Sequence, residues 1–285
     1  MLGRKTTGSV VCPNCGRLVG VRDAKCYQCG RPYPGLFGFA PAVNAIARNL
    51  SFGQMVLFGC VALYIVGLAM NPKEALRSGS FLGMLSPGGA ENFLLGMSGA
   101  GPIFGYGRWW TPLSAAWLHG GLIHIGFNMY WILQLAPATT QLLGTGRTII
   151  IYTAGAVVGF LGTSVMDLMP MPSFLAGAQF TLGASASLCA LMGGLYAYGR
   201  RSGQQAMQRW IGSFAIQILI LGLLIPGIDN WGHIFGFIGG YVATERLRPL
   251  EDESPLHMLG GVVCLVLFAA AIAASVLHGL PIYRQ

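Results

Sequence analysis

Long apolar segments constrain this chain more than any other feature of its sequence. Seven stretches are long enough to cross a bilayer: near 52–70, 121–141, 147–168, 180–199, 209–227, 231–247 and 257–278. A crossing takes about 20 largely apolar residues. Only 9% of the residues are charged, whereas a water-soluble domain carries roughly a quarter. The sequence therefore predicts an all-α, multi-pass integral membrane protein. No cleaved signal peptide is expected, because a basic, cysteine-rich arm precedes the first apolar stretch.

The positive charges predict how the chain is oriented in its membrane. The formal net charge is +8, and seven of the seventeen Lys and Arg residues precede residue 50. Most others lie in short loops, at Arg147, at 200–209 and at 246–248. Basic loops remain cytoplasmic, so we expect a cytoplasmic N-terminus and an external C-terminus, in the bacterial inner (plasma) membrane. No basic stripe alternates with aromatic residues, so no nucleic-acid partner is expected.

Composition also divides the chain into regions. Residues 1–34 differ from everything after them and predict a small cytoplasmic module, and 35–51 read as a linker or interfacial segment. Residues 52–248 would hold six spans, and 249–285 a seventh span with a short tail. Within the core, residues 72–119 are too polar and glycine-rich to span, so they predict a long external loop whose clustered aromatic residues lie at the membrane interface.

The N-terminal module contains two pairs of cysteines in CxxC spacing. Cys12 and Cys15 form one pair and Cys26 and Cys29 the other, each followed directly by a glycine that relieves a tight turn. Four thiolates on two such turns close tetrahedrally on Zn²⁺. Two disulfides or a redox-active CxxC are the alternatives, but thiols on a cytoplasmic arm stay reduced. The spacing therefore predicts a structural Zn²⁺ in a zinc-ribbon-like module.

Several polar residues lie inside the apolar segments, where they are costly. His124 and Asn128 are in the second segment, Ser185 in the fourth and His233 in the sixth. Even-numbered spans all begin at the outer face in the expected topology. With a rise of 1.5 Å per residue, His124, Ser185 and His233 would all lie roughly 5–8 Å below the outer surface of the membrane. Three unlinked segments thus bring polar groups to one layer.

A serine, a histidine and hydrogen-bond donors in one layer are what acyl transfer needs. His233 would accept the proton of Ser185, while His124, Asn128 and the Ser185 backbone N–H would stabilise the oxyanion. The carboxylates of Asp167 and Asp229 lie only at span ends, which favours a dyad over a triad. The alternatives are a serine that only allows close helix packing, buried histidines with structural partners, and a metal site formed by His119, His124 and His233.

Three motifs carry a family resemblance. They are WLHGGLIHIGFNM at 117–129, GASASLCALMG at 183–193 and GHIFGFIGG at 232–240. They resemble the His-x4-His-x3-Asn, Gly-x-Ser and His-x2-Gly-x3-Gly elements of rhomboid intramembrane serine proteases, in the same order. The resemblance covers about residues 52–248. It implies a rhomboid-like core of six transmembrane helices, to which this chain adds a seventh helix and the cysteine-rich module.

The resemblance also implies roles for individual residues. Ser185 is expected to be the nucleophile, His233 the base, and His124 and Asn128 the oxyanion hole. It further implies a water-filled cavity open to the outside and substrates that are single-pass or polytopic membrane proteins within the lipid bilayer. No cofactor is expected for catalysis. Structural roles are expected for His119, Gly183, Gly236 and Gly240.

Two positions depart from the family pattern. Ala186 follows the nucleophile where the family most often has glycine, and its methyl group is expected to be harmless. Trp110-Thr111 stands where the first loop usually has Trp-Arg, which leaves the internal bracing of that loop to another residue, with Arg108 as a candidate.

Two functions from different classes remain. One is a serine endopeptidase that cleaves transmembrane segments through an acyl-enzyme. The other is a catalytically silent relative that binds membrane helices and uses the zinc module as a cytoplasmic adaptor. Retention of Ser185, His233, His124 and Asn128 favours the protease.

Overall fold

The computed structural model describes residues 4–12, 15–41, 50–77, 84–172 and 175–283. Parts of all four predicted regions lie outside these ranges: 1–3 and 13–14 of the module, 42–49 of the linker, 78–83 and 173–174 of the core, and 284–285 of the tail. Contacts divide the chain into two compact units, Met1–Met55 and Val56–Gln285.

The N-terminal unit is a small β-hairpin module with its own core. Strands β1 (Ser9–Val11) and β2 (Leu18–Gly20) pair antiparallel, with Val10 opposite Val19. Val10, Val19 and Cys26 are buried in the core. The 3₁₀ turn η1 (Leu36–Gly38) follows, and Ala40 is fully buried against this core. Residues 35–40, expected in the linker, therefore pack as part of the module.

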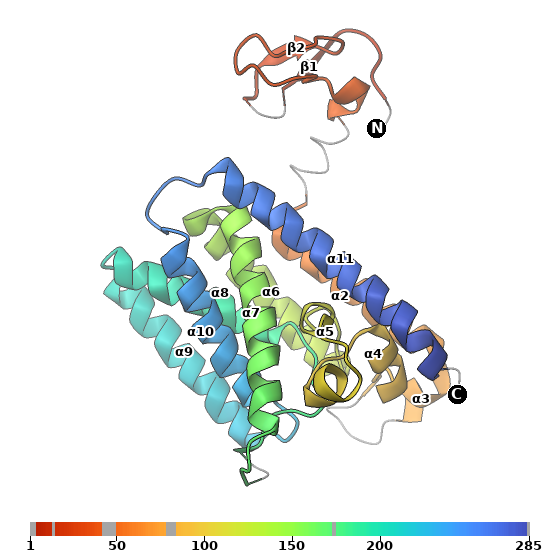
Figure 1. Ribbon diagram of the computed structural model, residues 1–285. Helices are drawn as coiled ribbons and strands as arrows, with labels where there is room; N and C mark the ends of the chain where they lie inside the picture. Colours follow the sequence, from red (N-terminus) through yellow and green to blue (C-terminus); the bar gives the residue numbers. More distant parts are fainter. Residues whose placement is uncertain (1–3, 13–14, 42–49, 78–83, 173–174, 284–285) are drawn as a thin grey trace. The chain divides into compact units, whose positions relative to one another are not determined.

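Within the described residues of the second unit, the regular elements are all helices, apart from an isolated β-bridge between Ser98 and Thr181 (Figure 1). Each of the seven predicted apolar segments is a helix, which confirms the predicted fold class. They are α2 (Phe52–Met70), α6 (Leu122–Leu143), α7 (Thr145–Asp167), α8 (Ser185–Arg201), α9 (Gln205–Leu224), α10 (Asn230–Arg246) and α11 (Pro255–Tyr283).

Four of these helices are long and apolar enough to cross a membrane: α2, α7, α9 and α11. Of the others, α8 and α10 have only 17 residues each, and α6 is more polar. Four of the seven predicted spans therefore meet this criterion of length and hydropathy. The remaining three are the helices that carry the predicted site residues.

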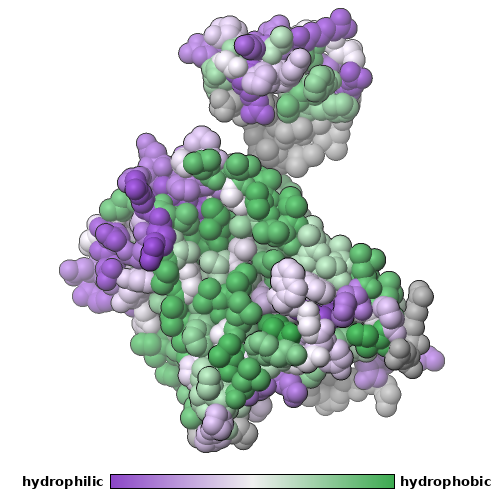
Figure 2. Space-filling model, viewed as in Figure 1, coloured by the Kyte–Doolittle hydropathy of each residue, from purple (hydrophilic) through white to green (hydrophobic). Residues whose placement is uncertain are grey.

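The burial of these helices follows their composition. Small residues let α8 lie against α6, α7, α9 and α10, and it is buried along most of its length. Within α9, described from end to end, only Ile211 is buried. Figure 2 shows hydrophobic residues over the long helices and a hydrophilic region, at the upper left of the second unit, where α8 joins α9 and the chain runs from α10 to α11. Exposed Arg200 and Arg201 belong to that end.

The predicted first loop contains short helices. Its described residues form the short helices α3 (Pro72–Arg77), α4 (Gly89–Leu95) and α5 (Thr111–Ala115), with a π-helical turn at Gly101–Gly105. Glycines separate these elements, and Gly96 ends α4 with a φ of 112° that favours glycine. The elements are too short to show a helical hydrophobic period, so the sequence alone did not reveal them.

Candidate active site

Ser185 and His233 lie within hydrogen-bond distance of each other. Ser185 is the first residue of α8 and His233 belongs to the first turn of α10, and 2.9 Å separates Ser185 Oγ from His233 Nε2. The second ring nitrogen of His233, Nδ1, is buried and has no hydrogen-bond partner among the described residues. The pair is therefore a dyad in geometry, and a neutral imidazole in this position is suited to accept a proton from the hydroxyl.

Glycines on α10 bring the two helices together. A Cβ added to Gly236 would collide with the carbonyl oxygen of Ala186, and one added to Gly240 with that of Ala190. These positions are one turn apart on both helices, so the backbones are in contact along two turns. This packing sets the separation between the helix ends that carry Ser185 and His233.

His124 presents a ring nitrogen beside the nucleophile. Its Nδ1 accepts a hydrogen bond from the Gly120 backbone N–H at 3.4 Å, so the ring proton is assigned to Nε2. A Cβ at Gly183 would lie 2.7 Å from that Nε2 and 3.7 Å from Ser185 Oγ. Gly183 has a φ of +128°. Both its conformation and its close approach to His124 therefore require glycine.

The other two predicted residues of this region lie around His124. Asn128 is buried one turn along α6 and donates through Nδ2 to the His124 carbonyl at 2.9 Å. The His119 ring is buried edge-on against that of His124, with centroids 5.0 Å apart. Burial, with a smaller contribution from His124, holds the pKa of His119 well below its usual value. A neutral ring in this place supports His124 by packing rather than by charge.

The N-terminus of α10 has a feature that sequence reasoning missed. The Asp229 carboxylate accepts hydrogen bonds from Gly232 N at 2.9 Å, from Thr163 Oγ1 at 2.8 Å and from Thr181 Oγ1 at 2.9 Å. Burial raises the pKa of Asp229, and these hydrogen bonds act in the opposite direction. Asp229 thus caps α10 and joins it to α7 and to the segment that precedes Ser185. An aspartate directly before a helical segment is the signal that could have revealed the cap.

Neighbouring residues show where the α8 side chains point. A Cβ at Gly159 of α7 would lie 2.8 Å from the Ala186 methyl carbon, so this methyl group points toward α7. Ser187 is fully buried, and its Cα would lie 3.0 Å from a Cβ at Gly155, also on α7. A small residue on α7 therefore makes room for Ala186.

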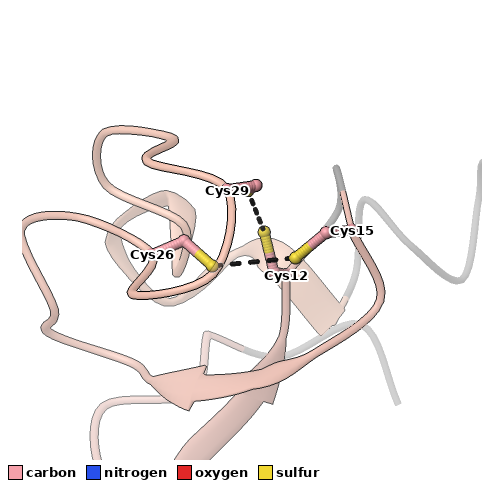
Figure 3. A group of neighbouring side chains, drawn as sticks. All are labelled: Cys12, Cys15, Cys26 and Cys29. Atoms are coloured by element: carbon pink, nitrogen blue, oxygen red, sulfur yellow. Dashed lines mark hydrogen bonds between the residues drawn. The ribbon is translucent and has the colours of Figure 1, made fainter.

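The four N-terminal cysteines form a separate cluster (Figure 3). Their sulfur atoms lie within 4.8 Å of one another, with Cys12 and Cys29 3.8 Å apart and Cys15 and Cys26 3.7 Å apart. Sulfurs at the corners of a tetrahedron around Zn²⁺ are about 3.8 Å apart, given Zn–S bonds of about 2.3 Å. The cluster could therefore hold a metal ion.

Two copies of one short motif build this cluster. Each CxxC pair is followed by Gly-Arg. In both copies the first cysteine donates its N–H to the arginine carbonyl and accepts a hydrogen bond from the glycine N–H, at 2.8–3.0 Å. The glycines have φ values of 74° and 70°, so the turn needs glycine in both copies. The two turns present their sulfurs to a common centre.

Comparisons with known proteins show which family the chain resembles. Residues 106–249 match the family described as Rhomboid domain. The chain is 31% identical over 170 residues to "Rhomboid protease GluP" of Bacillus subtilis, a match that covers 58% of this chain and 31% of GluP. Over 228 residues it is 26% identical to "Rhomboid protease GlpG" of Yersinia enterocolitica, covering 76% of this chain and 71% of that protein.

A further Bacillus subtilis protein, "Putative rhomboid protease YdcA", is 27% identical over 143 residues, which cover 48% of this chain and 67% of YdcA. The family match spans half of the chain and contains His119, His124, Ser185 and His233. Together with the apolar helices, it establishes that this integral membrane protein belongs to the rhomboid family.

Proposed function

We propose that this chain is a serine endopeptidase that hydrolyses peptide bonds in transmembrane segments of other membrane proteins. The observation that carries the proposal is the 2.9 Å distance between Ser185 Oγ and His233 Nε2. A small-residue packing role for Ser185 needs no imidazole at that distance. The alternative, a silent adaptor, likewise has no use for both members of a dyad held together.

In the proposed reaction, Ser185 Oγ attacks the scissile carbonyl carbon while His233 Nε2 takes the hydroxyl proton. The carbonyl oxygen becomes an oxyanion, which His124 Nε2–H, the Asn128 amide and the Ser185 backbone N–H stabilise. The first N–H groups of α8 have no intrahelical acceptor and are free for this role. His233 then protonates the leaving amine, and an acyl-enzyme ester on Ser185 remains.

Hydrolysis repeats these steps with water as the nucleophile. His233 removes a proton from water as it attacks the ester, and returns that proton to Ser185 Oγ when the carboxylic acid product leaves. No cofactor takes part. The proposed substrates are single-pass or polytopic membrane proteins that reach the site through the bilayer.

The proposed arrangement in the membrane follows the basic loops. The N-terminus is cytoplasmic and the C-terminus external, in the bacterial plasma membrane. Residues 52–248 form the protease core, 249–285 an added helix and tail, and the N-terminal module a cytoplasmic unit. For that module we propose a structural Zn²⁺ bound by Cys12, Cys15, Cys26 and Cys29.

Labelling with a serine-directed fluorophosphonate tests the catalytic assignment in the detergent-solubilised full chain. We expect the wild type to label and Ser185→Ala and His233→Ala not to label. Ser187→Ala is the matched control, because Ser187 lies two residues away on the α7 side of the same helix, and it should label like the wild type. Equal labelling of all four proteins would refute the assignment.

A further inference from the structure

The helix α11, which follows the proposed protease core, packs against the first external loop. It contacts α4, α5 and α7, and Figure 1 shows it running alongside this part of the molecule. Its buried residues Phe268, Ala271, Ser275 and Gly279 recur every three or four positions and so form one helix face. A Cβ at Gly279 would lie 2.9 Å from a methyl carbon of Leu94 in α4. The contact is close enough for backbone polar groups to take part.

A buried arginine joins α11 to the end of α4. Arg108 is fully buried, and its guanidinium donates to the carbonyls of Phe93 at 2.5 Å, Leu94 at 3.4 Å and Ser275 at 2.9 Å. It also lies 4.3 Å above the Phe93 ring. The Phe93 and Leu94 carbonyls belong to the last turn of α4, the end of a helix that attracts a positive charge, and the Phe93 carbonyl also accepts a hydrogen bond from the Gly96 N–H at 3.2 Å. One cation therefore holds three backbone carbonyls from two elements.

The Ser275 hydroxyl makes a second connection, to α5. Trp110 Nε1 donates to Ser275 Oγ at 3.0 Å, and Ser114 Oγ lies 3.3 Å from the same oxygen. Ser114 Oγ in turn donates to the Gly96 carbonyl at 2.8 Å. A Cβ at Gly96 would collide with both serine hydroxyls, so the Gly96 backbone lies directly against them. Ser275 and Ser114 are fully buried, and hydrogen bonds in such surroundings are costly to break.

The loop held by α11 also holds the segment that leads to Ser185. Ser98 and Thr181 exchange two backbone hydrogen bonds, of 3.0 and 2.8 Å, in an isolated antiparallel bridge. The Gly183 N–H donates to the Ala115 carbonyl of α5 at 2.9 Å. Thr111 Oγ1 donates to Ser98 Oγ at 3.2 Å and so ties the bridge to α5. Residues 181 and 183 therefore depend on the same loop that Ser275 and Arg108 fix.

The opposite end of α11 is fixed independently. The Glu253 carboxylate accepts from the backbone N–H groups of Thr145 at 3.1 Å and Arg147 at 2.9 Å, at the start of α7. The Arg147 guanidinium donates to the carbonyls of Glu251 and Asp252 at 2.8 and 3.1 Å. With both ends attached, α11 cannot slide along the core without breaking buried hydrogen bonds.

We propose that α11 positions the nucleophile: Ser275 and Arg108 hold the 96–115 loop, and this loop holds the 181–183 segment that places Ser185 opposite His233. The inference rests on the proposed function only for its catalytic consequence. Ser275 and Arg108 touch no reacting atom, so they are positioning residues. The appended helix thereby becomes part of the active-site framework.

Ser275→Ala is the central variant for the test, because it removes the hydroxyl but keeps the backbone carbonyl that accepts from Arg108. Loss of this acceptor leaves the partly buried Trp110 indole N–H without its partner Ser275 Oγ, an effect of the order of tenfold on a local equilibrium. We therefore expect the fluorophosphonate labelling rate of Ser185 to fall about tenfold. Val266→Ala, at a position 62% exposed on the same helix, is the matched control and should label at the wild-type rate.

A double-mutant cycle with Trp110→Phe separates positioning from general destabilisation. If the Trp110–Ser275 hydrogen bond carries the effect, Ser275→Ala combined with Trp110→Phe should be no slower than the slower single variant. If the losses in labelling rate of the two single variants instead multiply in the double variant, the proposal is overturned.

Hydrogen exchange supplies a readout that does not depend on catalysis. In Ser275→Ala, the amides of Thr181 and Gly183 should exchange at least about tenfold faster than in the wild type, and in Val266→Ala they should not. Unchanged exchange refutes the positioning role whatever the labelling shows. The two proposals can fail separately. If the wild type does not label but exchange in Ser275→Ala is accelerated, the proposed protease function is refuted while the positioning role of α11 stands.

Discussion

The Asp229 carboxylate gives the sharpest test of how the site is assembled, through Asp229→Ala and Asp229→Asn. Alanine removes the acceptor for three buried donors, on Gly232, Thr163 and Thr181. Loss of the helix cap costs about 1 kcal/mol, and each hydroxyl bond to a charged group about 1.5 kcal/mol. Relief of the buried charge offsets part of this. We expect the free energy of unfolding to fall by about 3 kcal/mol, the range typical of a broken buried network.

Asparagine should behave differently, because it keeps a carbonyl oxygen where Oδ1 accepts from Gly232 and Thr163. Its amide nitrogen would face Thr181, whose hydroxyl rotates to accept. We therefore expect Asp229→Asn to remain within about 1 kcal/mol of the wild type at neutral pH. Thermal unfolding of the full chain in detergent, followed by circular dichroism, measures the differences. Asp252→Ala, at an exposed position, serves as control.

The pH dependence has a defined sign. Burial raises the pKa of Asp229 in the folded chain, so the folded state binds this proton more tightly than the unfolded state. The stability of the wild type relative to Asp229→Asn should therefore increase as the pH falls through the raised pKa, and decrease as the pH rises through it. An Asp229→Ala protein as stable as the wild type, or equal losses in both variants, would show that the carboxylate does not hold these elements together.

Three further outcomes are expected. The purified chain should contain about one zinc ion, as measured by mass spectrometry of the metal. Cys12→Ser should lower this zinc content, because tetrahedral coordination needs all four thiolates, whereas Cys60→Ala should leave it unchanged. Equal zinc content in both variants would exclude the site. His124→Ala should slow fluorophosphonate labelling of Ser185 by about 10²–10³-fold, the usual effect of losing one oxyanion donor, and a wild-type rate would remove His124 from that role. Gly159→Ala should lower the free energy of unfolding by about 1–3 kcal/mol through overpacking, because its new methyl group would meet that of Ala186. Adding Ala186→Gly should restore part of that loss in thermal unfolding, and no recovery would contradict the packing described.

The long helices could be predicted from the sequence because hydropathy is a property of consecutive residues. Ser185, His124 and His233 could be singled out because each is a polar residue near the start of an apolar segment. The cysteine cluster followed from spacing alone. Close approach of α10 to α8 was also foreseeable, since Gly236 and Gly240 lie one turn apart.

The remaining features depend on partners that are distant in sequence. Arg108 and Ser275 are 167 residues apart, and neither stands in a pattern that indicates the other. The Asp229 carboxylate accepts from Thr163 and Thr181, which lie 66 and 48 residues away in the sequence. Side-chain hydrogen bonds of this kind are set by tertiary packing, which local propensity does not encode.

The repeated Cys-x-x-Cys-Gly-Arg turn has a consequence for how the N-terminal module responds to its surroundings. Each turn supplies half of the thiolates, and neither has enough ligands to retain an ion alone. Metal binding in such a module is coupled to folding, and the valines beneath the turns form only a small core. Losing one ligand therefore frees both halves together, so the module should exist either loaded and folded or empty and open, with no stable state between.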